Sequence, residues 1–179
     1  MEENEKQYLS DKLRRIKDFP KEGILFRDIS SWLMDPDSIN IMADDLYRQY
    51  ADKGITKVVC LESRGFLVGA ILAKMLHVGI VMARKPGKLP VKTKSETYTK
   101  EYGTDTIEMA EDAISTDDVV LIHDDLLATG GTALAAYKLV KQFNPKAVYA
   151  SFLLEITDEG LHGRYVFPKE LPLYTVVTE

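Results

Sequence analysis

Short apolar runs alternate with helical patterns along most of this chain, and this alternation limits its fold more than any other feature. Four runs rich in β-branched residues have the length of strands: 58–61, 79–83, 119–122 and 147–156. Amphipathic periods with the length of helices cover about 36–54, 66–76 and 132–143. Strands that alternate with helices form βαβ units, in which helices cover both faces of a parallel sheet. The sequence therefore predicts one α/β domain over 1–179, built on a twisted, mostly parallel sheet.

The ends of the chain's elements give further predictions. Leu9, Leu13 and Ile16 recur at helical spacing and predict a short first helix. Asp35 is the expected N-cap of the next helix, because Pro36 follows it at the first helical position. Two segments do not fit the alternation. Residues 19–31 are rich in turn formers, and 85–103 form a long polar connection without an apolar period, which in a compact domain is usually functional or disordered.

Charge and composition exclude several classes of function. A net charge of −5 does not suit a nucleic-acid partner, whose phosphates require a basic surface. No stretch approaches the roughly 18 uninterrupted apolar residues of a membrane span, and the N-terminus lacks the apolar core of a signal peptide. The single cysteine, Cys60, lies inside an apolar run and is expected to be a buried structural thiol. These features predict a cytoplasmic protein that binds neither membranes nor nucleic acids.

The stretch 120–132, VLIHDDLLATGGT, is the most informative motif. An apolar strand leads to two adjacent carboxylates, Asp124 and Asp125, and then to a glycine turn that opens a helix. Because two glycines remove Cβ atoms, backbone N–H groups at the helix N-terminus can converge on one anion. The carboxylates would repel a phosphate but accept hydrogen bonds from vicinal sugar hydroxyls. Either half alone also suits an ordinary strand end; together they favour a sugar-phosphate site.

Two other segments carry candidate anion ligands. The turn 62–66, ESRGF, places a hydroxyl, a guanidinium and a glycine before a helix, which suits a second anion site. By itself, Arg64 could also be an exposed arginine near a helix cap. From Arg84 to Lys100 there are six basic residues and one acidic residue, and composition alone would equally allow a solvated lysine-rich hairpin.

The 120–132 stretch resembles the phosphoribosyl-pyrophosphate signature of type I phosphoribosyltransferases, in the form of the adenine branch. The resemblance implies that Asp124 and Asp125 engage the ribose 2′ and 3′ hydroxyls. It implies that the 5′-phosphate is held by the glycine turn: Ala128, Thr129, Gly130, Gly131 and Thr132. It assigns the pyrophosphate to the LESRGF and RKPGKLP segments, through Glu62, Ser63, Arg64, Gly65, Arg84 and Lys88. In the family the first of these segments contains a cis peptide.

YTKEYG resembles the family's catalytic flexible loop, so the lid is expected over about 85–103, with Tyr98 and Gly103 on it. The catalytic candidates are Glu101, Arg64 and Tyr102, with Glu101 assisting proton movement or stabilising the ribosyl cation. FPKEGILFRDI, within 19–31, resembles the family's N-terminal hood. Leu25 and Phe26 would pack around the base, the Arg27 backbone would read its edge, and Leu161 would form the opposite wall.

The resemblance implies the type I phosphoribosyltransferase fold, a twisted parallel sheet flanked by helices with a small hood. It implies transfer of a phosphoribosyl group to adenine, yielding AMP and pyrophosphate, with Mg²⁺ bound through substrate oxygens and water, in a homodimer. Two alternatives stay open. A sibling transferase could use hypoxanthine, guanine, xanthine or orotate, against which the hood sequence speaks. A ligand-sensing regulator could reuse the fold, but it should carry a DNA-binding segment and a basic face.

Overall fold

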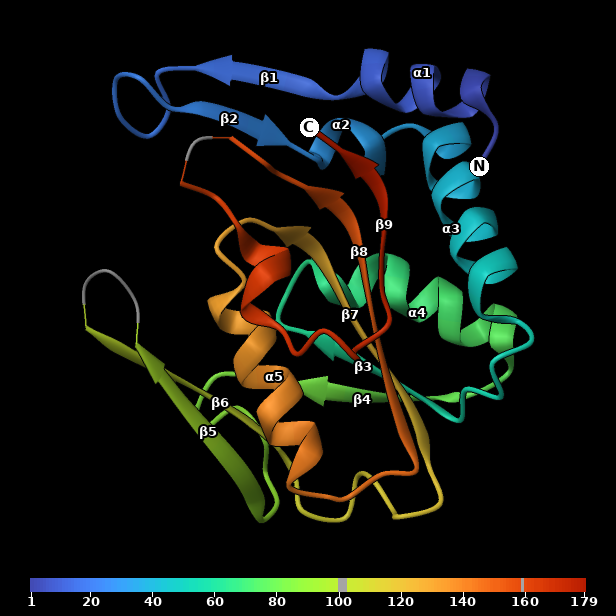
Figure 1. The fold of residues 1–179 in the computed structure, drawn as a ribbon, viewed down its shortest axis with the longest axis vertical. Helices are drawn as coiled ribbons and strands as arrows, with labels where there is room; N and C mark the ends of the chain where they lie inside the picture. The colour runs from blue at the N-terminus through green and yellow to red at the C-terminus, as the bar shows by residue number, and fades with distance from the viewer. Residues whose placement is uncertain (100–102, 159) are drawn as a thin grey trace.

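A parallel sheet forms the centre of the molecule, as the alternation predicts (Figure 1). The computed structural model describes residues 1–99, 103–158 and 160–179. The strands follow the order β4 (Gly79–Ala83), β3 (Lys57–Leu61), β7 (Val119–Leu127), β8 (Ala147–Glu155) and β9 (Leu173–Thr178). Every neighbouring pair in this order is parallel. The edge strand β9 was not predicted from the sequence.

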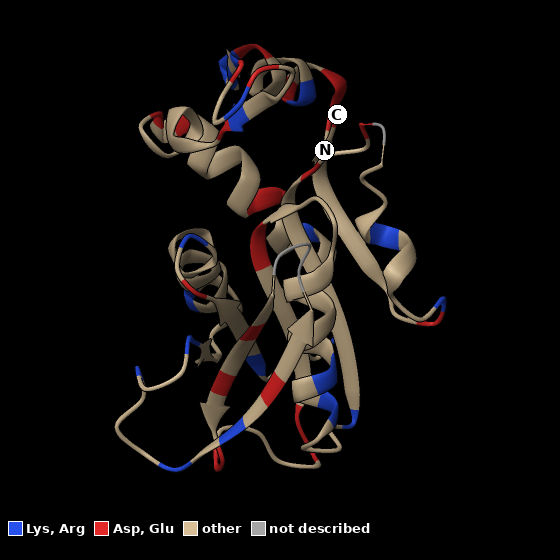
Figure 2. Ribbon diagram, turned by 90° about the vertical axis from the view of Figure 1, so that its left-hand side faces the viewer, with Lys and Arg blue, Asp and Glu red and all other residues tan. Residues whose placement is uncertain are grey.

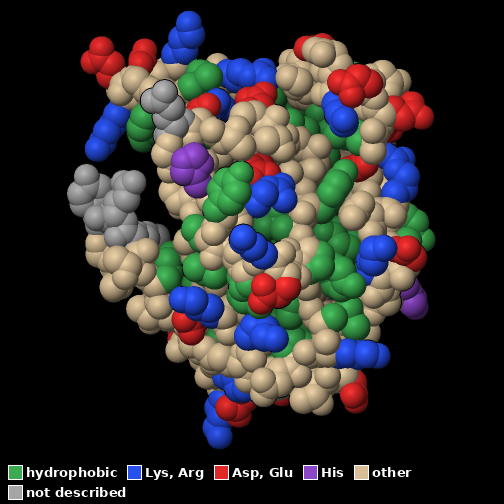
Figure 3. Space-filling model, viewed as in Figure 1, with side chains coloured by type: hydrophobic (Ala, Val, Ile, Leu, Met, Phe, Trp, Pro, Cys, Tyr) green, Lys and Arg blue, Asp and Glu red, His purple; other side chains and the backbone are tan. Residues whose placement is uncertain are grey.

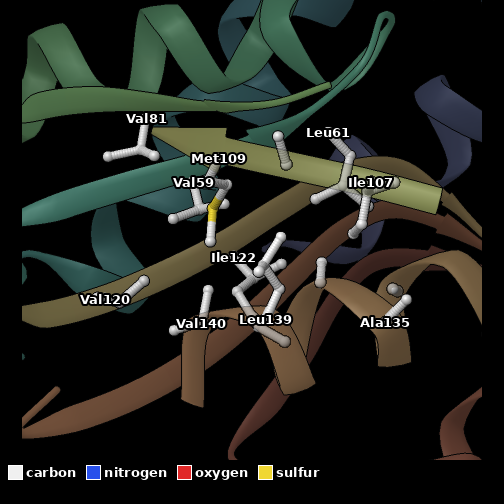
Figure 4. Close-up of a cluster of buried hydrophobic side chains, with 14 of the residues drawn as sticks. Val59, Leu61, Val81, Ile107, Met109, Val120, Ile122, Ala135, Leu139 and Val140 are labelled. Atoms are coloured by element: carbon white, nitrogen blue, oxygen red, sulfur yellow. The ribbon is translucent and has the colours of Figure 1, made fainter. Parts of the chain in front are cut away.

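Helices cover both faces of this sheet because its strands are apolar on both sides. Val58 and Cys60 pack with α3 (Pro36–Tyr50) and α4 (Gly65–Leu76) on one face. Val59 and Leu61 point the other way, toward α5 (Gly131–Lys141). Figure 4 shows Val59, Leu61, Val120 and Ile122 of the sheet in one cluster with Leu139 and Val140 of α5. None of the helices in the described ranges is long and apolar enough to cross a membrane.

The N-terminal segment lies over one end of the sheet, and we call residues 3–33 the hood, a wider range than the predicted 19–31 (Figure 1). It contains α1 (Glu3–Lys12), β1 (Arg14–Lys17), β2 (Leu25–Asp28) and α2 (Ser30–Leu33). The helix predicted through Ile16 ends instead at Lys12, because Arg14–Lys17 pairs in antiparallel register with Leu25–Asp28. Ile16 is 37% exposed, so its helical spacing to Leu9 and Leu13 did not reflect a shared buried face. Tertiary pairing therefore overrides the local period here.

Helix α3 agrees with its prediction at the start and departs from it at the end. The Asp35 side chain caps the helix, accepting the Ser38 backbone N–H at 3.0 Å. The helix ends at Tyr50, and a turn over 51–54 follows it and ends at Gly54, which has a φ of +64°. Gly54 thus closes the turn after the helix instead of the helix itself.

The segment 85–103 contains a strand that the sequence did not reveal. Strand β5 (Thr93–Thr99) pairs antiparallel with β6 (Thr104–Ala110). The sequence TKSETYT of β5 has no apolar alternation, and none of its side chains is fully buried. The fully buried side chains of this pair, Ile107 and Met109, belong to β6 and join the core that includes α5. Within the predicted lid range 85–103, Thr93–Thr99 is therefore a strand of an antiparallel pair, and the expectation of a connection without regular structure is wrong for these residues.

Candidate active site

The carboxyl ends of β3 and β7 lie at one edge of the sheet, and the turns after them border two adjoining hollows. Ligands of open parallel sheets bind at this edge. The larger hollow has a volume of about 350 Å³ and is lined by Leu61, Glu62, Ser63, Arg64, Ala83, Arg84, Lys85, Tyr98, Ile107, Asp124, Asp125 and Thr132. The smaller, of about 180 Å³, is lined by Arg64, Asp124, Asp125, Leu126 and 128–133. The structure thus brings the two glycine turns and the cations together.

The acidic pair lies inside strand β7, which runs to Leu127 and past the predicted end at Ile122. Asp124 is opposite Phe152 in the ladder with β8. The Arg64 Nε lies 2.7 Å from Asp125 Oδ2, although Arg64 is 51% exposed and Asp125 only 6%. Burial raises the pKa of Asp124 well above its ordinary value, and the neighbouring Asp125 charge adds to this. A hydroxyl of a ligand that donates a hydrogen bond to Asp124 would stabilise its charged form and offset the cost of burying that charge.

The two glycines of the phosphate turn have different structural roles. Gly130 has a φ of +79°, and a Cβ there would lie 2.6 Å from the Gly163 carbonyl oxygen. Gly130 is therefore required by backbone shape and by close packing, which the sequence did not indicate. Among the described residues, a Cβ on Gly131 would meet nothing nearer than Tyr98 Cδ2 at 3.8 Å. Gly131 begins α5 and leaves open space at a helix N-terminus, where an anion is favoured.

The pyrophosphate turn contains a cis peptide between Glu62 and Ser63, in the segment where the resemblance places one. Gly65 starts α4, and a Cβ there would lie 2.9 Å from Asp124 Oδ1 and 3.0 Å from the His123 carbonyl oxygen. Glycine at this position therefore lets α4 begin close to β7. Ser63 and Arg64 are exposed, so they face the hollow while Gly65 is buried beneath them.

Glu62 orients the cations around the larger hollow. Its Oε1 lies 2.8 Å from Arg84 Nη2, and its Oε2 accepts the Lys85 backbone N–H at 2.9 Å. Both contacts lower the pKa of Glu62, the Arg84 bond most. Arg84 also donates to the Lys88 carbonyl at 3.1 Å, and its buried Nε has no hydrogen-bond partner among the described residues. The Lys88 side chain is exposed and lines neither hollow.

Buried neutral groups support the acidic pair from behind. His123 is fully buried, its Nδ1 lies 2.9 Å from Ser151 Oγ, and burial lowers its pKa to about 4. Burial also raises the pKa of Cys60 to about 12, in keeping with the predicted structural thiol. A Cβ on Gly69 would approach both side chains, to 2.4 Å from Cys60 Sγ and 3.0 Å from His123 Cδ2. Near neutral pH this layer is therefore uncharged and tightly packed.

The residues expected around the base lie in the hood and in the segment after β8. Leu25, Phe26 and Arg27 belong to β2 and are half-buried, and Phe26 packs edge-on against Phe19 at 5.1 Å between ring centroids. Leu161 is half-buried, and its N–H donates to the Asp158 carbonyl at 2.9 Å. None of these residues lines either hollow described above. The catalytic candidates Glu101 and Tyr102 lie outside the described residues.

Sequence reasoning missed three contributors to the site. Lys85 lines the larger hollow and forms an ion pair with Asp105 of β6. Gly163, far along the chain, packs closely against the phosphate turn. A Cβ there would lie 2.5 Å from the Ala128 carbonyl oxygen, so this position has no room for a side chain. The basic run that contains Lys85 was a usable signal, but nothing local to Asp105 or Gly163 points to this site.

By fold and by the groups at its sheet edge, the molecule has the features of an α/β protein that holds a phosphorylated sugar. Residues 36–164 match the phosphoribosyl transferase domain family. An adenine phosphoribosyltransferase from Phocaeicola vulgatus is 51% identical over 97% of this chain and 98% of its own length. The solved adenine phosphoribosyltransferase from Rhodothermus marinus is 44% identical, with a TM-score of 0.91 over 99% of this chain and 100% of its own.

A third relative carries a ligand. The Giardia lamblia enzyme, solved with 9-deazaadenine, is 40% identical, with a TM-score of 0.87 and 96% coverage of both chains. This chain belongs to the phosphoribosyltransferase family and, within it, to the adenine phosphoribosyltransferases. The comparisons confirm the predicted family and the predicted type I fold.

Proposed function

We propose that this protein transfers the 5-phosphoribosyl group of 5-phosphoribosyl-1-pyrophosphate to adenine, producing AMP and pyrophosphate for purine salvage. The observation that carries the proposal is an acidic pair, a glycine turn and a cation cluster around one 350 Å³ hollow, in a chain 51% identical to an adenine phosphoribosyltransferase. Adenine N9 forms a bond to the anomeric carbon with inversion, the bond from that carbon to the pyrophosphate oxygen breaks, and N9 loses its proton.

The ribose phosphate is held at the end of β7. Asp124 and Asp125 accept hydrogen bonds from the 2′ and 3′ hydroxyls, which relieves the cost of keeping Asp124 charged while buried. The backbone N–H groups of 128–132 and the helix dipole of α5 hold the 5′-phosphate. Arg64 pairs with Asp125 at 2.7 Å in the structure, so an arriving pyrophosphate would draw Arg64 away and release Asp125 for ribose.

The pyrophosphate leaves against a set of cations and N–H donors. Arg64, Arg84 and Lys88 neutralise the leaving group, Ser63 and Gly65 shape its turn, and Glu62 holds Arg84 in place at 2.8 Å. Mg²⁺ would be held mainly by substrate oxygens and water, and the carboxylates bordering the hollow fit an oxygen-seeking ion. When bound, the ion would neutralise charge on the pyrophosphate.

The base lies between the hood and the segment after β8. Leu25 and Phe26 pack on one side, Leu161 on the other, and the Arg27 backbone reads the edge of adenine. Adenine presents an amine donor and an N1 acceptor, whereas hypoxanthine presents a carbonyl acceptor and an N1–H donor. Hypoxanthine would therefore leave two buried groups unsatisfied, each costing roughly 1–3 kcal/mol.

The lid completes the site. Glu101 assists proton movement at the base or stabilises the ribosyl cation, and Tyr102 and Arg64 act with it, while the hairpin excludes water from the activated sugar. The protein works in the cytoplasm as a homodimer. Exposed apolar side chains at the β4 edge support a second copy: Ile80 at 45%, Met82 at 46% and Leu67 of α4 at 50% exposure.

Pyrophosphate release measured with each base in turn tests this proposal. We expect adenine to exceed hypoxanthine and guanine in kcat/KM by roughly a thousandfold, as in sites that read substrate hydrogen bonds. Comparable turnover of hypoxanthine would contradict the assignment of adenine as the substrate, whereas the assignment of a phosphoribosyltransferase reaction would stand. No turnover of any base, with phosphoribosyl pyrophosphate still bound, would favour the sensing regulator. On the face shown in Figure 3, Lys and Arg are interspersed with Asp and Glu, which does not suit DNA binding.

A further inference from the structure

The Arg27 side chain is buried among three separate segments. Its side chain is 7% exposed, in strand β2 of the hood. Nη1 donates to the Leu25 carbonyl at 2.8 Å and pairs with Asp158 at 2.5 Å, and Nε lies 3.4 Å from Glu179 Oε2. One guanidinium thus bridges the hood, the turn after β8 and the residue that follows β9. Figure 1 shows the end of β9 close beneath the hood.

The partners of Arg27 are themselves held by the sheet. The Glu179 N–H donates to the Glu155 carbonyl at 2.9 Å, and the Thr157 N–H donates to the Glu179 carbonyl at 2.6 Å. The other carboxylate oxygen of Glu179 pairs with Arg15, which lies opposite Arg27 in the hood hairpin. We call these ion pairs, Arg27 with Asp158 and Glu179, and Glu179 with Arg15, the clamp. The clamp joins the central sheet to both strands of the hood hairpin.

This clamp adds a polar attachment to the hood hairpin, whose two strands are flanked by the buried Leu13 and Ile29. All four residues of β1 are exposed and all four of β2 are only half-buried, so no fully buried apolar side chain fixes either strand. Figure 2 shows charged residues of both signs gathered in the hood at the top of the view. A planar guanidinium with several fixed donors can hold three partners in one geometry, which a lysine cannot.

We propose that the Arg27 side chain is a positioning residue that sets the two walls of the base pocket relative to each other. It holds the Leu25 carbonyl on the hood side and Asp158 on the other, and the Asp158 carbonyl in turn accepts the Leu161 N–H at 2.9 Å. The inference rests on the proposed base pocket. It adds a role for the side chain to the predicted role of the Arg27 backbone, so truncation of this side chain affects base binding.

Steady-state kinetics of Arg27→Ala, Arg27→Lys and Glu179→Gln test the proposal, with each substrate varied separately. We expect the KM for adenine to rise roughly tenfold to a hundredfold, the range given by loss of a charge-assisted hydrogen bond. The KM for phosphoribosyl pyrophosphate should stay within about twofold, since its site lies on the sheet. The preference for adenine over hypoxanthine should fall. Arg27→Lys should restore little of the adenine KM, because a lysine ammonium lacks the planar set of donors of a guanidinium.

Arg14→Ala is the matched control, because Arg14 belongs to the same hairpin and pairs with Asp28 at 3.2 Å but is 52% exposed. It should keep both KM values. Circular dichroism identifies any variant that does not fold, and Glu179→Gln then provides the test, since it keeps Arg27 intact. Suppose that the wild type prefers adenine but the clamp variants leave the adenine KM unchanged or raise both KM values equally. That result overturns this inference alone. A wild type without adenine preference overturns the proposed base pocket instead.

Discussion

At the scale of single residues, identical side chains acquire different chemistry from their surroundings. Asp124 and Asp125 are neighbours in β7, yet Asp124 has its pKa raised by burial while Asp125 holds Arg64 at 2.7 Å. The same holds for the paired glycines of the phosphate turn. Gly130 is fixed by a φ of +79° and by Gly163, whereas Gly131 faces open space. Only the second of these glycines can be changed without disturbing the fold.

Gly131→Ala should fold normally and lose affinity for phosphoribosyl pyrophosphate by roughly tenfold or more, about 1.4 kcal/mol. The added Cβ meets no atom of the described residues nearer than 3.8 Å, but it would lie where the 5′-phosphate approaches the helix N-terminus. Titration calorimetry measures the affinity and thermal unfolding the stability. Gly130→Ala is the contrast: it should lower stability, because its Cβ would lie 2.6 Å from a carbonyl oxygen. If folded Gly131→Ala binds phosphoribosyl pyrophosphate with wild-type affinity, the 5′-phosphate does not bind at this turn.

At the scale of elements, one hydrogen bond links the hairpin to the phosphate turn. The Tyr98 hydroxyl of β5 lies 2.9 Å from Thr132 Oγ1 and donates to Asp105 of β6 at 3.2 Å. Tyr98 also packs against the core that includes Ala135 and Leu139 of α5. The C-terminal end of β5 is therefore attached to the helix that begins at the phosphate turn, so the position of one depends on the other.

Tyr98→Phe should lower kcat/KM for phosphoribosyl pyrophosphate about three- to tenfold, which corresponds to one hydrogen bond of roughly 0.5–1.5 kcal/mol. The ring still packs, so stability should change little, and the loss should reflect a misplaced Thr132 hydroxyl. Initial rates at varied phosphoribosyl pyrophosphate measure it. Tyr165→Phe is the control, because Tyr165 is 82% exposed. Equal effects from both variants would show that the Tyr98 hydroxyl has no special role.

At the scale of the whole molecule, the β4 edge of the sheet exposes apolar side chains. Strand β4 is an outer strand, and its Ile80 and Met82 are about half exposed beside Leu67 of α4. Val58 and Cys60, which lie opposite these two residues in the ladder, face the core formed with α3 and α4. The apolar layer thus continues beyond the last strand into solvent, where a second copy would cover it.

Ile80→Asp should therefore shift the protein from dimer to monomer, because a buried, unpaired carboxylate at an interface costs several kcal/mol. Analytical ultracentrifugation at micromolar concentration reads the mass directly. Met34→Asp provides the matched control, since Met34 is 67% exposed and lies between α2 and α3, away from the β4 edge. A dimer that survives Ile80→Asp would locate the interface elsewhere on the surface.

The sequence by itself determined four of the five strands of the central sheet, β3, β4, β7 and β8, and the position of the proposed site. An apolar run, a glycine turn and a helix are consecutive in the chain, so 57–76 and 119–141 can be recognised as strand–turn–helix units from local patterns. Parallel strands end at the same edge, which places both turns together without further information. The predicted strand β4 agrees with the structure at both ends, Gly79 and Ala83.

Tertiary structure alone decided the polar strands and the long-range contacts. Strands β1 and β5 have no apolar alternation, and each exists because a partner strand provides its backbone hydrogen bonds. Gly130 depends on Gly163, and Arg27 on Glu179, which is 152 residues away. Such contacts leave no periodic signal, because they involve single residues from segments that meet only after the sheet has formed. The chemistry of the site can therefore be read locally, whereas the geometry that holds it depends on the complete fold.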